Sequence, residues 1–187
     1  EACHGGHLSI VEMLLNHDMG LLEILDSHGE TPLLFAADHR QFEIVRFLLD
    51  RGANALATNN NGSTSLLRAC EKGADLKTVR KLLAAGCDLE ARDSRQRTAL
   101  RSAAVYCEPE VMRELIVEHN ANICAVDNEG ETPFDSVIMR DRSAGEIRAF
   151  LIECFGNELT QKHGRLALHA ALAAAEYSFI EEWDFHP

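Results

Sequence analysis

Cysteine and histidine are the residue types in this sequence that could bind a metal ion or form a nucleophile and its base. The segment ACHGGH at 2–7 places Cys3, His4 and His7 close together. A zinc site needs a fourth ligand in tetrahedral geometry, and no candidate lies nearby in sequence. Cys107 and His119 offer a nucleophile and a base, but a whole predicted helix separates them. The spacing therefore predicts neither a metal site nor a catalytic pair.

Other catalytic patterns are also missing from the sequence. It contains no glycine-rich phosphate loop, nucleophile elbow or His-Glu-x-x-His motif. The remaining histidines recur singly along the chain and form no cluster; five of them are His28, His39, His119, His163 and His169. Without these patterns we expect no enzyme activity, cofactor or small-molecule substrate.

Composition limits the classes of partner and the cellular compartment. The 187 residues are 46% hydrophobic and carry 30 acids against 18 bases, a net charge of −12 that disfavours nucleic acid. Six scattered cysteines without Cys-x-x-Cys spacing predict buried thiols inside the cell, in cytoplasm or nucleus. The longest apolar stretch, 166–175, is too short for a bilayer, so no membrane partner is expected. Because the chain opens with Glu1, we expect a fragment of a longer protein.

A repeat of 33 or 34 residues organises the chain. Five similar segments begin at Asp26, Asn59, Asp93, Asp127 and Gln161: DSHGETPLLFAA, NNNGSTSLLRAC, DSRQRTALRSAA, DNEGETPFDSVI and QKHGRLALHAAL. A second pattern with apolar residues at helical spacing follows each turn, as in IVEMLL at 10–15 and IVRFLL at 44–49. Each unit is therefore a turn, a short helix and a longer helix.

The spacing predicts helix pairs at 31–39 and 42–50, 64–72 and 76–84, 98–106 and 109–118, and 132–140 and 144–154, with a further helix at 166–174. N-caps are expected at Thr31, Thr64, Thr98 and Thr132, two of them followed by Pro32 and Pro133. Positive φ is expected in the turns at Gly29 and Gly62, and at the helix ends at Gly52, Gly86 and Asn120. Leu48, Leu82 and Leu115 share one site and should be buried between units.

These motifs resemble the ankyrin repeat family, whose D-x-x-G-x-T-P-L-H-x-A-A pattern is recognisable in all five segments. GHLSIVEMLL at 6–15 is similar to the family's second-helix pattern. The resemblance implies an all-α solenoid of stacked helix-turn-helix repeats with short β-hairpin-like turns. It implies one array over 1–187: a partial repeat at 1–25, repeats at 26–58, 59–92, 93–126 and 127–160, and a partial repeat at 161–187.

The resemblance also implies a function, because ankyrin arrays usually bind a protein partner on their concave side. Carried over by motif position, the expected contact residues are the turn tips, the residue after each turn glycine and the ends of the first helices. They are Ser27, His28, Glu30, Asp38, His39, Asn60, Asn61, Ser63, Glu71, Lys72, Ser94, Arg95, Arg97, Arg101, Val105, Tyr106, Asn128, Glu129, Glu131, Met139 and Arg140. The array is expected to be a monomer with one protein partner of unknown identity.

An arginine cluster is unusual in so acidic a chain. Arg92, Arg95, Arg97 and Arg101 fall within ten residues, followed by Tyr106. We expect a positive patch that selects an acidic partner, and substitution of Arg95 and Arg97 by glutamate should then leave the melting point nearly unchanged. A solvated turn is the alternative. Two further readings remain open: a structural spacer array, or an adaptor segment beside a catalytic domain elsewhere in the protein.

Overall fold

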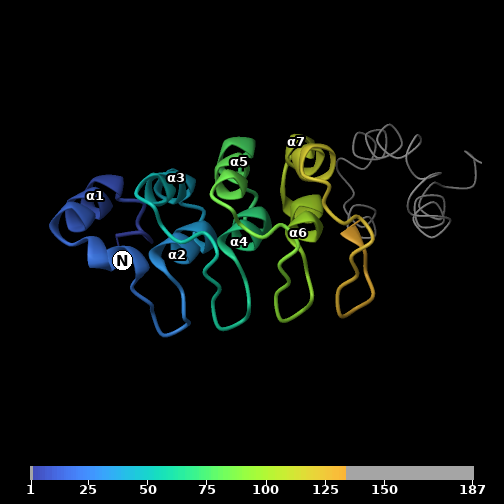
Figure 1. The fold of residues 1–187 in the computed structure, drawn as a ribbon, viewed down its shortest axis with the longest axis horizontal. Helices are drawn as coiled ribbons and strands as arrows, with labels where there is room; N and C mark the ends of the chain where they lie inside the picture. Colours follow the sequence, from blue (N-terminus) through green and yellow to red (C-terminus); the bar gives the residue numbers. More distant parts are fainter. Residues whose placement is uncertain (1, 134–187) are drawn as a thin grey trace, which may run out of the picture.

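Residues 2–133 are described by the computed structural model, and they form a row of helix pairs joined by long loops (Figure 1). The first helices and the loops lie on one side of the row, and the second helices lie on the other. The elements are α1 (Leu8–His17), the 3-10 helix η1 (Met19–Glu23), α2 (Pro32–Asp38), α3 (Phe42–Asp50), α4 (Ser65–Glu71), α5 (Leu76–Ala84), α6 (Ala99–Tyr106), α7 (Pro109–Arg113) and the π-helical turn η2 (Glu114–Glu118).

The helix pairs predicted between residues 31 and 106 are confirmed within one or two residues at each end. The helix predicted at 109–118 is different, because α7 is short and continues as the wider turn η2. Apolar periodicity could not reveal this, since the buried residues Leu115 and Ile116 keep their helical spacing through the wider turn. The helices predicted at 132–140, 144–154 and 166–174 lie outside the described residues, apart from the first two positions.

The predicted N-caps at Thr31, Thr64 and Thr98 are confirmed. The side-chain oxygens of Thr31, Thr64 and Thr98 accept hydrogen bonds from the N–H groups three residues later, at 3.3, 3.2 and 3.3 Å. After the second helices the backbone turns through positive φ at Gly52, Gly86 and Asn120. These caps fix where each helix begins and therefore which of its residues face the neighbouring unit.

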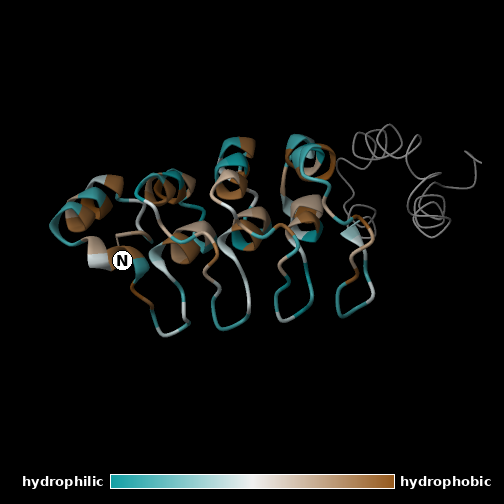
Figure 2. Ribbon diagram, in the orientation of Figure 1, coloured by the Kyte–Doolittle hydropathy of each residue, from teal (hydrophilic) through white to brown (hydrophobic). Residues whose placement is uncertain are grey.

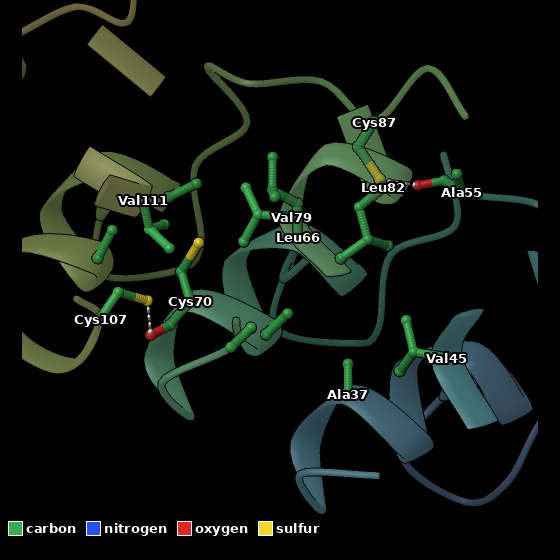
Figure 3. Packing of buried hydrophobic residues seen from close by; sticks show 14 of the residues in the cluster. Ala37, Val45, Ala55, Leu66, Cys70, Val79, Leu82, Cys87, Cys107 and Val111 are labelled. Carbon is green, nitrogen blue, oxygen red and sulfur yellow. Dashed lines mark hydrogen bonds between the residues drawn. The ribbon is translucent and has the colours of Figure 1, made fainter. Parts of the chain in front are cut away.

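The core runs between consecutive helix pairs. Leu48, Leu82 and Leu115 are each 0% exposed, which confirms their predicted burial. Hydrophobic residues are concentrated on the helices and polar residues along the loops (Figure 2). In the close view, Leu66, Val79 and Leu82 of the third unit pack together in the interior (Figure 3). Burial shared between neighbours makes each unit depend on the next for its stability.

Three thiols belong to this core. Cys70, Cys87 and Cys107 are buried, and the Cys107 and Cys87 thiols donate to the carbonyl oxygens of Cys70 and Ala55 at 3.4 and 3.2 Å (Figure 3). The neighbouring Cys107 thiol and burial raise the pKa of Cys70 well above its usual value, and burial raises that of Cys87. The five cysteines of the described range are free, as the sequence suggested, and Cys154 lies outside it.

Candidate functional site

Four hairpin loops line one side of the molecule, and each is held by the Asp or Asn at its start. In the loop of residues 92–97, Asp93 Oδ1 accepts hydrogen bonds from the N–H groups of Arg95 and Arg97, both at 2.9 Å. Asp26, Asn59 and Asp127 form the same two bonds in their loops. The predicted turn, in which an Asp or Asn side chain accepts hydrogen bonds from its own loop backbone, is confirmed. It gives every tip the same backbone shape.

Backbone hydrogen bonds also connect one tip to the next. The N–H of Asn60 donates to the carbonyl of His28 at 3.1 Å, and the N–H of Ser94 to that of Asn61 at 2.8 Å. The N–H of Asn128 donates to the carbonyl of Arg95 at 3.0 Å. The four hairpins thus stand side by side as a connected edge, which presents tip side chains from a backbone with little freedom (Figure 1).

Ion pairs connect the first helices of neighbouring units. Arg68 on α4 lies 2.9 Å from Glu71 and 3.6 Å from Asp38 on α2. Lys72 Nζ lies 3.4 Å from the same Asp38 carboxylate. Since the side chains of Arg68, Asp38 and Glu71 are only 17–26% exposed, these charges are partly shielded from water.

The arginine cluster differs from the expected free patch. Arg97 donates to Asp93 Oδ2 through two nitrogens, at 2.6 and 2.8 Å, and to Glu71 at 3.0 Å. Arg101 donates to Asp127 at 2.9 Å and to Glu131 at 2.7 Å. The expectation of a free positive patch is therefore wrong for these two residues, because their guanidinium groups tie units together.

The pKa values of two aspartates in these pairs, Asp93 and Asp127, are lowered. Burial raises the pKa of Asp93, but the hydrogen bonds from Arg97 lower it by more. The pKa of Asp93 therefore lies below its usual range. Asp127 behaves in the same way, with backbone N–H groups and Arg101 outweighing its burial. The pKa of Arg97 is raised, since its hydrogen bond to Asp93 and the charge of Glu71 outweigh burial.

Arg92 and Arg95 retain uncompensated positive charge. Arg92 Nη1 donates to two neutral groups, the carbonyls of Val126 at 2.9 Å and Gln96 at 3.3 Å. Arg95 is exposed, and its side chain forms no ion pair with any described residue. Tyr106 lies at the end of α6 and is 49% exposed. Of the four arginines, Arg97 and Arg101 are therefore held in ion pairs, Arg92 is held by carbonyl oxygens, and Arg95 is exposed.

The structure places the predicted contact residues in four groups. The exposed ones are Ser27, His28, Asn60, Asn61, Ser94, Arg95, Tyr106, Asn128 and Glu129. The half-buried ones are Glu30, Asp38, His39, Glu71, Lys72, Arg97, Arg101, Val105 and Glu131. Ser63 is buried at 1% exposure, which leaves its side chain little surface for contact with a partner. Met139 and Arg140 lie outside the described residues.

Two features of this side were not predicted from the sequence. Gln96 has φ of 60°, whereas the other three hairpins have glycine at that position, at Gly29, Gly62 and Gly130. The missing turn glycine was visible in the sequence, but not that Gln96 would adopt the same left-handed backbone. Three rings also meet near the first unit: His39 stacks on Phe35 at 4.1 Å, and His4 approaches His39 edge-on at 4.8 Å.

Metal-ligand clusters and membrane-spanning helices are both absent from residues 2–133. No group of three His, Cys, Asp or Glu side chains in this range is arranged to hold a metal ion. None of the helices described here is both long enough and apolar enough to cross a membrane.

Comparison with known proteins gives the family. A family model described as ankyrin repeats (3 copies) matches residues 1–59 and 53–127. A transient receptor potential cation channel subfamily A member 1 homolog of Caenorhabditis elegans is 35% identical over 150 residues, which are 80% of this chain and 12% of that protein. An ankyrin repeat, SAM and basic leucine zipper domain-containing protein 1 of Dasypus novemcinctus is 36% identical over 59% of this chain and 24% of its own length.

The E3 ubiquitin-protein ligase KEG of Arabidopsis thaliana is 32% identical over 54% of this chain and 6% of its own. The chain thus spans less than a quarter of the length of these relatives. Ankyrin repeats are generally protein-interaction modules without catalytic activity. Because the family match covers more than half of the residues and agrees with the stacked helix pairs, the chain belongs to the ankyrin repeat family.

Proposed function

We propose that this chain binds another protein on the concave side formed by the hairpin tips and the first helices α2, α4 and α6. The observation that carries the proposal is the connected hairpin edge, in which a regular backbone presents unlike side chains. Successive tips offer His28, Asn61, Arg95 and Glu129 at one equivalent position. A surface with fixed spacing and variable chemistry suits selective recognition, because little conformational entropy is lost on binding.

We further propose that the chain acts as a monomeric adaptor segment inside the cell. Its share of the relatives' length is small, so the activity of the whole protein would belong to other segments. The buried free thiols fit a reducing compartment. The acidic net charge of −12 fits a protein partner better than nucleic acid.

A spacer role is the second candidate, and ion pairs on the other side of the molecule favour it. Arg51 on the second unit pairs with Glu12 on α1, Arg46 on α3 with Asp75, and Arg80 on α5 with Glu114. These pairs join consecutive units without forming a recognition surface. A spacer needs this continuity but needs no selective tip chemistry.

Affinity capture with matched variants separates the two roles. One variant carries His28→Ala and Tyr106→Ala on the proposed binding side, and the control carries Glu43→Ala and Lys77→Ala on α3 and α5; all four residues are exposed. A binding module should capture a protein with the parent and the control and lose it with the first variant. Equal capture by all three, or loss with both variants, would contradict binding on this side.

A further inference from the structure

The hairpin of residues 92–97 is here called the fourth hairpin because it opens the fourth unit, counting the partial repeat at 1–25 as the first. It differs in charge from the rest of the molecule. It contains Arg92, Arg95 and Arg97 against the single acid Asp93, so it carries three positive charges and one negative. The whole chain has a net charge of −12. The rest of the chain is acidic and repels an acidic partner, so such a partner would be attracted to this positive loop and not to the surrounding surface.

Of the two ion-pair groups beside this hairpin, one is neutral, and the other, Arg101 with Asp127 and Glu131, carries one net negative charge. The ion-pair network of Asp38, Glu71 and Asp93 with Arg68, Lys72 and Arg97 has three acids and three bases. Arg92 donates to carbonyl oxygens, which satisfy its N–H groups without removing its charge. The Arg95 side chain, exposed and without an ion pair in the described range, is left as the point of contact.

The tip around Arg95 is shaped for hydrogen bonding. Gln96 adopts φ of 60°, a left-handed conformation that disfavours side chains other than glycine, and Arg92 braces its carbonyl oxygen at 3.3 Å. Ser94 and Asn61 add a neutral hydroxyl and an amide on neighbouring positions, joined by the bond from Ser94 N–H to the Asn61 carbonyl. The next tip carries the acid Glu129, so a carboxylate would approach from the Asn61 side.

We propose that the fourth hairpin selects an acidic segment of a partner protein, with Arg95 gripping an Asp or Glu carboxylate and Ser94 and Gln96 bonding the neighbouring peptide groups. Arginine binds a carboxylate through two parallel hydrogen bonds, which gives direction as well as affinity. This inference rests on the proposed function, and it narrows that function to one hairpin and one class of ligand. Arg97 and Arg101 hold the units together and take no direct part.

Selection from a displayed library of short peptides tiled across a proteome tests the inference. The parent should enrich peptides rich in Asp and Glu relative to the input library. Arg95→Gln should bind the selected peptides roughly tenfold more weakly, because a charge-assisted hydrogen bond is lost. Lys77→Gln, which removes an equally exposed cation from α5, should bind them like the parent. Arg95→Glu should instead enrich peptides rich in Lys and Arg.

The possible failures are distinguishable. If the parent selects peptides without acidic enrichment, or Arg95→Gln binds the selected peptides as tightly as the parent, the acidic ligand is wrong while protein binding stands. If the parent selects no peptide and also captures no protein, both proposals fail. If Lys77→Gln weakens binding as much as Arg95→Gln, the effect is one of net charge, and the inference is overturned.

Discussion

The hairpin of the third unit, residues 58–63, here called the third hairpin, has the same backbone as the fourth hairpin but lacks its positive charge. Asn59 and Asp93 each accept the same two N–H bonds, yet Asn59 uses its amide to reach Glu30 at 2.9 Å, whereas Asp93 pairs with Arg97. The third hairpin has Gly62 at the position with positive φ, where glycine adopts this conformation without strain. The fourth hairpin has Gln96 in the same left-handed conformation. The difference teaches that the repeat specifies shape through a few positions and leaves the others free to carry charge and recognition.

The largest expected effect removes the support that both hairpins share. Leu82 on α5 is 0% exposed in the core between the third and fourth units. Leu82→Ala should lower the free energy of unfolding by about 2–5 kcal/mol, because it removes buried methyl groups and leaves a cavity. Denaturant unfolding measures this, with Leu83→Ala, a partly buried neighbour, as the milder control. A parent-like unfolding midpoint for Leu82→Ala would contradict the assigned stacking.

A smaller effect should separate the two hairpins. Arg97→Gln leaves the Asp93 carboxylate, whose side chain is 3% exposed, without its charged partner, and should cost about 2–3 kcal/mol. Ser63→Ala at the equivalent site of the third hairpin should cost less than about 1 kcal/mol. This corrects the sequence-based expectation that glutamate at 95 and 97 would leave melting unchanged. Equal costs in thermal unfolding would show that the Arg97 ion pairs contribute little.

Acid should weaken the ion pair between Asp93 and Arg97 in the fourth hairpin. The folded pKa of Asp93 lies below its unfolded value of about 3.9, so the unfolded state binds more protons in that range. The stabilisation is therefore present above roughly pH 4 and is lost as the pH falls through the folded pKa. Unfolding measured from neutral to acidic pH should show a shallower loss for Arg97→Gln than for the parent. Parallel curves would contradict the coupling.

The smallest expected change in stability comes from substituting the tip residue with positive φ, which is Gln96 in the fourth hairpin and Gly62 in the third. Gln96→Gly should raise the free energy of unfolding by about 0.5–1 kcal/mol, since glycine adopts positive φ without the steric cost. Gly62→Gln should lower it by about 1 kcal/mol, although its Cβ would meet the Arg92 carbonyl oxygen at an ordinary 3.4 Å. Chemical unfolding of both variants measures the pair. Changes of the same sign would show that strain does not distinguish the tips.

Much of the fold could be predicted from the sequence, because repeat phase, threonine caps and apolar spacing are local signals that recur. The self-bonding Asp and Asn residues of the turns were predictable for the same reason. The ion pairs of the arginines could not be predicted, because Arg97 pairs with Glu71 and Arg101 with Asp127 across 26 positions in sequence. Similarly, the burial of Ser63 and the strained Gln96 depend on how one unit lies against the next.

The proposal that the fourth hairpin selects its ligand through the charge of Arg95 is tested most directly by a titration of matched tip variants. Arg95→Asn gives the fourth tip the residue that the third has at Asn61, and Asn61→Ser alters the third tip without changing charge. Calorimetry with an acidic peptide selected by the parent should show roughly tenfold weaker binding for Arg95→Asn and a clearly smaller loss for Asn61→Ser, which exchanges one neutral polar group for another. Parent-like affinity for Arg95→Asn would contradict the account.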